Sequence, residues 1–244
     1  MKNLLKSLLA YFNLEIRVKF NPSEMTNFDA DTIEIAKKYS MTNKYRLWSL
    51  VQLIKYINSQ NLEGDFVECG VWKGGNLILM QKYIEKLNLN KSIYGFDTFT
   101  GMSEPTDFDI SVNTKNSLKK FNKLKLDDNS SEWCYAEIDE VNENIRSNVD
   151  EPSNISLIKG MVEETLKNAE NLPDKISILR LDTDFYESTK VELEVLYPRL
   201  VKGGVLIIDD YGWWEGSKKA VDEYFNSSSL PLQYIDHTGR FLIK

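Results

Sequence analysis

Four aspartates lie directly after two apolar segments in the second half of the chain. Asp182 and Asp184 follow one segment, and Asp209 and Asp210 follow the next. In an open parallel sheet the carboxyl ends of the strands face one crevice, where ligands bind. Carboxylates gathered there repel one another unless they are protonated or bind a cation, and oxygen ligands alone favour a hard divalent ion such as Mg²⁺. The pattern favours a metal held by Asp182, Asp209 and Asp210, with helix-capping carboxylates as the alternative.

A glycine turn in the first half of the chain is a second candidate site. Gly70, Gly74 and Gly75 follow an apolar segment with the spacing G-x-x-x-G-G, which differs from the dinucleotide fingerprint G-x-G-x-x-G. Glycines let a ligand approach the backbone, and the start of the next helix offers free N–H groups to a nucleotide-like molecule. Glu68 lies inside the apolar segment, and because a buried unpaired carboxylate is costly, it must accept hydrogen bonds or meet a cation. The alternative is a tight turn whose acid is capped by backbone amides.

Asp97 stands at the end of the next apolar segment. Folds of the α/β class that bind nucleotides place an acid near this point of the chain, where it receives the two ribose hydroxyls. A carboxylate accepts both donors of a vicinal diol. Asp97 is therefore a predicted ribose-binding residue, unless it only caps a turn or a helix.

The elements that must position these residues alternate between apolar segments and helical patterns. This alternation predicts an α/β fold, with a parallel sheet and helices on both faces. A last pair of short strands around a His-Thr-Gly turn predicts an antiparallel edge. The seven predicted strands are 65–69, 92–96, 155–158, 176–181, 205–208, 232–235 and 240–243; the predicted helices are 29–39, 45–59, 76–87, 162–170, 188–200 and 217–225.

Two parts of the chain lie outside the alternation. Residues 1–60 are predicted to form an N-terminal helical arm, on the side of an acceptor or a partner subunit, in front of a main domain at 61–244. Residues 98–153 are an insert between the second and third strands, and this insert is polar apart from a possible helix at 116–124. A connection of this length and polarity favours a mobile lid.

The first helix of the arm has an apolar face. Such a face suits packing on the main domain, on a second copy of the chain or on a membrane surface. Its residues are Leu4, Leu5, Leu8, Leu9 and Phe12.

Composition excludes several classes of protein. The chain has 244 residues, with 30 Lys and Arg against 37 Asp and Glu, so its net charge is −7. Because nucleic-acid phosphates are bound by clustered Lys and Arg, nucleic acid is not an expected partner. Cys69 and Cys134 do not make a disulfide framework or a zinc site, and no apolar run is long enough to cross a membrane. We expect a cytoplasmic protein.

Five fragments in this order resemble one known family. They are VECGVWKGG, YGFDTFTGM, LIKGMVEETL, LRLDTDFYEST and GGVLIIDDY, and the resemblance to the macrocin O-methyltransferase (TylF/MycF) family spans roughly residues 41–225. Members of that family methylate sugar hydroxyls with S-adenosylmethionine and a divalent metal. The resemblance implies the seven-stranded, Rossmann-like sheet of class I methyltransferases, in agreement with the strands counted above.

The resemblance also implies roles for individual residues. Asp182, Asp209 and Asp210 look like the metal-binding triad, and Asp184 matches the proposed general base, so that Asp182 and Asp184 are the catalytic acids. The implied cofactor site contains Glu68, Gly70, Gly74 and Gly75 on the methionine and ribose side, Asp97 on the ribose, Gly160 and Val162 beside the adenine, and Met41 and Thr42 closing over the cofactor.

Other residues are weaker candidates. His237 is the single histidine; it could act as a base, but its place in a predicted hairpin turn favours a structural role. Trp213 and Trp214, with Tyr211, either stack on a sugar ring or pack at the start of a helix. Tyr45, Trp48 and residues 102–108 are further candidates for an acceptor pocket.

The predicted function is therefore a metal-dependent O-methyltransferase acting on the hydroxyl of a small-molecule sugar acceptor, in a nucleotide sugar, a surface glycan or a glycosylated natural product. The rivals are the same reaction on a catechol-like diol, a dehydrogenase, which gives no reason for the later aspartates, and a non-catalytic cofactor-binding protein. The family resemblance and the apolar N-terminal helix also favour a homo-oligomer.

Overall fold

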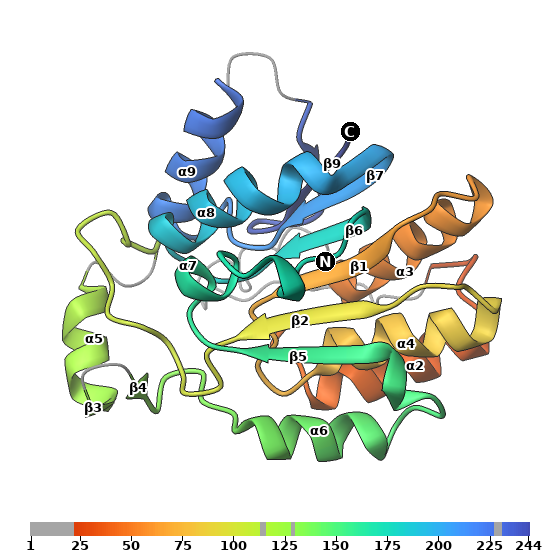
Figure 1. The fold of residues 1–244 in the computed structure, drawn as a ribbon, viewed down its shortest axis with the longest axis horizontal. Coiled ribbons are helices and arrows are strands. Elements are labelled where there is room, and N and C mark those ends of the chain that lie inside the picture. Colours follow the sequence, from red (N-terminus) through yellow and green to blue (C-terminus); the bar gives the residue numbers. More distant parts are fainter. Residues whose placement is uncertain (1–21, 113–115, 128–129, 227–230) are drawn as a thin grey trace, which may run out of the picture.

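The computed structural model describes residues 22–112, 116–127, 130–226 and 231–244 (Figure 1). The amphipathic helix predicted around Leu4 to Phe12 lies outside these residues. Within the described residues, no helix is both long enough and apolar enough to span a bilayer.

A seven-stranded sheet forms the centre of the molecule, as predicted (Figure 1). Its order is β5-β2-β1-β6-β7-β9-β8; the first five strands are parallel, β9 runs antiparallel to β7, and β8 runs antiparallel to β9. The order reverses beside β1, since β2 follows on one side and β6 on the other, and ligands bind at such a switch point. The strands are β1 (Asp65–Cys69), β2 (Ile93–Asp97), β5 (Ile155–Lys159), β6 (Ile176–Leu181), β7 (Leu200–Ile208), β8 (Gln233–Tyr234) and β9 (Arg240–Ile243).

Helices cover both faces of the sheet. In Figure 1, α2, α4 and α6 lie in the lower part of the view, near β2 and β5, and α8 and α9 lie in the upper part, near β7. The lower layer is α2 (Asn27–Lys38), α3 (Lys44–Ser59), α4 (Gly75–Leu87) and α6 (Ile138–Arg146); the upper layer is α7 (Val162–Thr165), α8 (Tyr186–Leu196) and α9 (Glu215–Phe225). Short 3₁₀ turns at Pro152–Asn154, Ala169–Asn171 and Tyr197–Arg199 complete the connections. The predicted helix at 162–170 is thus split into α7 and one of these turns.

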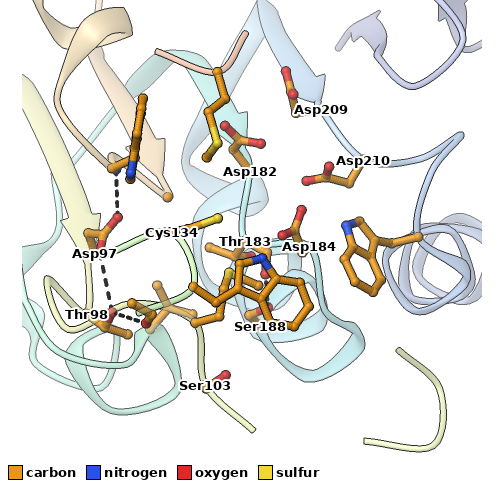
Figure 2. A pocket seen from close by; sticks show the side chains of 18 of the residues that line it. Asp97, Thr98, Ser103, Cys134, Asp182, Thr183, Asp184, Ser188, Asp209 and Asp210 are labelled. Atoms are coloured by element: carbon orange, nitrogen blue, oxygen red, sulfur yellow. Dashed lines mark hydrogen bonds between the residues drawn. The ribbon is translucent and has the colours of Figure 1, made fainter. Parts of the chain in front are cut away.

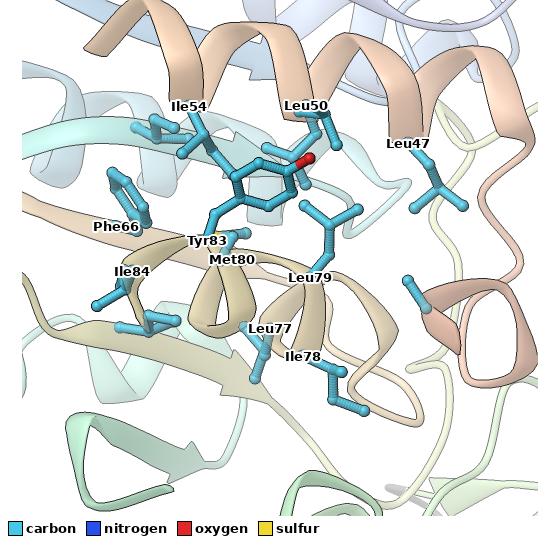
Figure 3. Close-up of a cluster of buried hydrophobic side chains, with 14 of the residues drawn as sticks. Leu47, Leu50, Ile54, Phe66, Leu77, Ile78, Leu79, Met80, Tyr83 and Ile84 are labelled. Atoms are coloured by element: carbon cyan, nitrogen blue, oxygen red, sulfur yellow. The ribbon is translucent and has the colours of Figure 1, made fainter. Parts of the chain in front are cut away.

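Alternating side chains of the strands fill two cores, because successive residues of a strand point to opposite faces. Phe66 packs into the lower core, while Val67 and Cys69 pack into the upper one. The lower core is built largely by α3 and α4, whose apolar faces meet in Figure 3, for example at Ile54 and Tyr83. The second half of the predicted N-terminal arm therefore shares a core with the sheet.

The insert differs in part from the prediction. Its first helix, α5 (Ser117–Leu124), lies where a helix was expected and is followed by a small ribbon of β3 (Lys125–Asp127) and β4 (Ser130–Ser131). A second helix, α6, was not predicted, and its Val141 and Ile145 are buried in the lower core. This half of the insert packs on the main domain, and the mobile lid stays a prediction. The apolar pattern of α6 consists of Ile138, Val141 and Ile145, too few to stand out in a polar sequence.

Candidate active site

A cavity of about 520 Å³ opens at the carboxyl ends of the central strands. Its size lies within the roughly 300–1,000 Å³ usual for small-molecule sites. Among the residues expected to form a site, those that line it are Met41, Thr42, Gly70, Asp97, Gly160, Val162, Asp182, Asp184, Asp209 and Asp210. Glu68, Gly74 and Gly75 are not part of its lining.

Three carboxylates converge on one side of this cavity. Asp182, Asp184 and Asp210 each offer an oxygen, and these oxygens lie within 4.8 Å of one another (Figure 2). Asp184 has a left-handed backbone conformation with φ of 69°, which is unusual outside glycine and is often found at functional sites. One buried oxygen of Asp210 has no hydrogen-bond partner. Three oxygen donors and an unpartnered buried oxygen suit a hard divalent cation.

Burial raises the pKa of each of these three acids. The pKa of Asp184 rises to about 7, although a hydrogen bond with Asp210 lowers it. Burial holds the pKa of Asp182 well above its usual value against the attraction of Arg180, and the pKa of Asp210 is raised by burial and by the charges of Asp184 and Asp209. A bound cation would supply the positive charge that the ionised carboxylates require.

Asp209, the third predicted metal ligand, faces away from this group. Figure 2 shows its carboxylate apart from that of Asp210, although the two residues are adjacent in the chain. One of its oxygens accepts a hydrogen bond from Arg180 at 2.6 Å, and the other accepts one from Arg46 of α3. Arg46 also pairs with Asp236 of the C-terminal hairpin, at 3.2 Å. The role of Asp209 as a metal ligand stays a prediction.

Arg180 is the residue of this site that the sequence analysis missed. It is only 2 % exposed, in the middle of the sheet, and it is the register partner of Glu68 on β1. Its guanidinium donates to Glu68 at 2.5 Å and to Asp182 at 2.7 Å, in addition to Asp209. These carboxylates raise the pKa of Arg180 against the effect of burial, so it stays charged. The sequence did contain a clue to this ion pair, because Arg180 and Glu68 are charged residues inside two apolar segments, and those segments become neighbouring strands.

Glu68 thus meets a cation, as expected for a buried acid. It also accepts a hydrogen bond from Asn76 at 2.8 Å. Burial raises its pKa to about 7, and the attraction of Arg180 and this hydrogen bond lower it. Because Glu68 is fully buried and lies outside the cavity lining, it acts on the cavity through Arg180.

Asp97 lies across the cavity from the three carboxylates (Figure 2). It accepts hydrogen bonds from the backbone N–H groups of Val71, Trp72 and Phe99, at 2.7–2.9 Å. Burial raises its pKa, while these bonds lower it. Asp97 therefore orders the glycine turn. A fourth contact, from the Thr98 hydroxyl, is long at 3.4 Å, so one of the about four acceptor positions of the carboxylate is still open to a ligand.

The glycines are needed for close packing. Gly70 has a positive φ of 86°, and a Cβ there would lie 2.0 Å from the backbone oxygen of Asp182. A Cβ on Gly75 would lie 2.4 Å from the oxygen of Ala36, at the end of α2. The motif thus holds β1 against β6 and α4 against α2, and only Gly70 of the three reaches the cavity.

An aromatic cluster bounds the cavity beside the carboxylates. We call Phe121, Trp133, Phe185 and Trp214 the aromatic wall; all four are buried and come from the insert and from the loops after β6 and β7. Trp133, Trp213 and Trp214 line the cavity, and so does His237, whose ring lies 5.8 Å from that of Trp213. Of the other acceptor candidates, Met102 and Ser103 line the cavity, whereas Tyr45, Trp48, Phe108 and Tyr211 do not.

The sheet order, the antiparallel last strands and the cavity at the carboxyl ends define a class I methyltransferase. The family model of macrocin-O-methyltransferase (TylF) matches residues 5–244, and the chain belongs to this family. It is an S-adenosylmethionine-dependent O-methyltransferase, so neither a dehydrogenase nor a non-catalytic protein describes it.

Individual relatives support this assignment. Demethyldecarbamoylnovobiocin O-methyltransferase of Streptomyces niveus is 30% identical over 190 residues, which cover 78% of this chain and 68% of that protein. The 8-demethyl-8-(2,3-dimethoxy-alpha-L-rhamnosyl)-tetracenomycin-C 4'-O-methyltransferase of Streptomyces olivaceus is 29% identical over 206 residues, covering 83% and 74%. The solved structure of the O-methyltransferase NovP superposes with a TM-score of 0.71 at 30% identity, covering 84% of this chain and 82% of that one.

Proposed function

We propose that this enzyme transfers the methyl group of S-adenosylmethionine to a sugar hydroxyl of a small molecule, with a divalent cation such as Mg²⁺ bound at the aspartates. The observation that carries this proposal is the convergence of Asp182, Asp184 and Asp210 at the wall of one cavity. The Streptomyces olivaceus relative supports the sugar, since its name describes a rhamnosyl acceptor.

The cofactor occupies the half of the cavity near Gly70 and Asp97. Asp97 accepts ribose hydroxyls with the acceptor capacity that the backbone amides leave free. Gly160 and Val162 border the adenine, and Met41 and Thr42 lie along the opposite edge; all of these residues line the cavity. Glu68, Gly74 and Gly75 support this half from outside the cavity lining. Glu68 fixes Arg180, and the two glycines fix the start of α4.

Asp182 and Asp210 hold the cation in both arrangements that the site allows. The third carboxylate is either Asp184, which points at the other two, or Asp209, once it turns from its arginines. A divalent cation bound here supplies Lewis acidity, which lowers the pKa of a sugar hydroxyl. In the second arrangement Asp184 is free to accept the hydroxyl proton.

The transfer itself is an in-line displacement at the methyl carbon. The protein must hold the acceptor oxygen and the donor methyl group about 3–3.5 Å apart and exclude water. The aromatic wall is suited to both tasks, because indole faces stack on the apolar face of a sugar and keep water out. In the arrangement with Asp209 as the third ligand, Asp184 receives the proton at a carboxylate oxygen.

The test compares three variants: Asp184→Asn, Asp209→Asn and the exposed control Asp174→Asn. Mg²⁺ affinity is measured by calorimetry, and methyl transfer is followed by release of S-adenosylhomocysteine. If Asp184 is the base, its variant binds Mg²⁺ normally and loses transfer, while Asp209→Asn loses Mg²⁺ affinity. The reverse pattern makes Asp184 the ligand. Full transfer by both variants, or full transfer by the wild type in EDTA, would contradict the proposal.

A catechol-like diol is the second candidate acceptor. The aromatic wall favours it, because such a substrate needs an apolar, aromatic pocket. A panel containing a rhamnoside, a nucleotide sugar and a catechol separates the two. If the enzyme methylates only the catechol, the acceptor in our proposal is a catechol-like diol and not a sugar.

A further inference from the structure

One cation on the wall of the cavity has no role in the proposal above. Lys120 of α5 lines the cavity, and its ammonium lies 3.8 Å from the ring centroid of Trp133. This is a cation–π contact with a residue of the aromatic wall, and it holds the charged group at the wall of the cavity.

Lys120 differs from the other charged residues around the cavity. Arg46 is the other Lys or Arg of the lining, and it is already paired with Asp209 and Asp236. Lys120 forms no ion pair with any carboxylate in the part of the chain that the structure describes. The acids of the lining are Asp97, Glu163, Asp182, Asp184, Asp209 and Asp210.

The position of Lys120 is fixed by the elements beneath it. Phe121, the next residue, is fully buried in the aromatic wall. Asn116 caps α5 by accepting from the backbone of Lys119, and Ser117 donates to the backbone oxygen of Asp109 at 2.6 Å. Asp109 in turn accepts from the first N–H of α8, at 2.8 Å. The helix that carries Lys120 is therefore tied to the element that follows Asp184.

We propose that Lys120 and Trp133 form a subsite for an anionic group on the acceptor, so that the preferred acceptor is a negatively charged sugar derivative. This proposal rests on the proposed function and narrows its substrate class. An anion at this subsite contacts the Lys120 ammonium, which has no ion pair among the described residues, and lies beside the aromatic wall. The anion is a phosphate, as in a nucleoside diphosphate sugar, or a carboxylate, as in a uronic acid; both offer oxygens to a lysine.

The first experiment measures binding without turnover. Thymidine diphosphate, glucuronate and glucose are titrated by calorimetry into enzyme saturated with S-adenosylhomocysteine, so that the cofactor half is filled. The buffer contains no divalent cation, so that phosphates cannot bind through a metal. The variants are Lys120→Met and Lys119→Met, a matched control that removes the same charge one residue away on the same helix.

We expect one of the two anions to bind the wild type and Lys119→Met equally and to bind Lys120→Met about tenfold more weakly, as for the loss of one charge-assisted contact. The anion that binds identifies the phosphate or the carboxylate source. Its affinity falls as salt rises, because the site is open to solvent. Unchanged affinity in Lys120→Met, equal losses in both variants, or no preference for anions over glucose would overturn the subsite.

A second measurement separates this proposal from the proposed function. The wild type is assayed for methyl transfer to a charged and to a neutral derivative of the same sugar. Lower KM for the charged derivative supports the subsite, and equal KM values overturn it while leaving sugar methylation intact. Methylation of neither derivative contradicts the proposed function itself. The S-adenosylhomocysteine affinity and the thermal midpoint of Lys120→Met report whether that variant is folded.

Discussion

The two halves of the cavity are built in different ways. The cofactor half is made by strand ends and backbone: Gly70 allows β1 to approach Asp182, and Asp97 is held by three backbone amides. The acceptor half combines the aspartates after β6 and β7 with side chains from the insert, from α3 and from the C-terminal hairpin. A half built on the sheet is positioned by the fold itself, whereas the other half depends on contacts between distant segments. We expect substrate choice to reside in the second half.

Arg180 joins the two halves, and its loss has the largest expected effect. The substitution Arg180→Met leaves Glu68, Asp182 and Asp209 buried without their common cation. Breaking a buried ion pair from one side costs about 3–5 kcal/mol of folding free energy. Urea unfolding followed by circular dichroism measures this cost, and Lys175→Met, on the exposed approach to the same strand, is the control. A loss below about 1 kcal/mol would mean that Arg180 does not join the halves.

Asp210→Asn tests whether the acceptor half is separate from the cofactor half. Removing one carboxylate of the cation and base site lowers kcat by about 10²–10⁴-fold, the usual range for a lost acid–base contribution. The affinity for S-adenosylhomocysteine, measured by calorimetry, should stay close to that of the wild type. A comparable loss of cofactor affinity would show that the two halves act as one.

Asp97→Asn is the opposite test. The amide keeps most of the shape but loses the charge that ribose hydroxyls and backbone amides contact. Hydrogen bonds to a charged group contribute about 1.5–3 kcal/mol, so cofactor affinity should fall by about 10–100-fold. At saturating cofactor, kcat should change much less. A variant that loses kcat while keeping cofactor affinity would contradict this division.

The smallest expected effect is the contribution of Asp184, in the acceptor half, to the pH dependence of stability; Glu68, whose pKa burial also raises to about 7, contributes in the same direction. The pKa of Asp184 is raised to about 7 by burial, so the folded chain binds more protons than the unfolded chain between the usual carboxyl range and pH 7. Stability therefore falls as pH rises through this interval. Thermal unfolding at several pH values without divalent cation should show this fall, and Asp184→Asn should reduce it. Saturating Mg²⁺ should offset the fall in the wild type; a flat profile without the cation would contradict it.

Much of this architecture was predictable, because apolar strands and helices leave strong local patterns. The parallel strands, the antiparallel hairpin and the aspartates at the strand ends were all expected. The ends of elements shifted by a few residues, as for β7, which begins at Leu200 instead of residue 205. Helix α6 was missed because three apolar positions, Ile138, Val141 and Ile145, carry its apolar signal within a polar segment.

The sequence predicted which residues form the site better than it predicted which of them pair with one another. Asp184 and Asp209 were both expected at the cavity, but the direction of Asp209 depends on Arg46 and Arg180, which lie far from it in sequence. Likewise, Gly74 and Gly75 lie outside the cavity lining and allow neighbouring helices to approach, so their contact with the cofactor stays a prediction. The spacing of residues predicts which strand end they occupy. It does not predict which cationic side chain neutralises which carboxylate.

The amino-acid sequence by itself determined the class of the fold, the family and the set of acids at the strand ends. These follow from local periodicity and from short motifs, which depend on residues close together in the chain. Tertiary structure alone decided that Arg180 neutralises three carboxylates, that Asp209 turns to two arginines, and that Lys120 lies over Trp133 with no acidic partner in the described chain. The physical reason is that charge balance in a buried site is set by neighbours in space, and sequence order does not specify them.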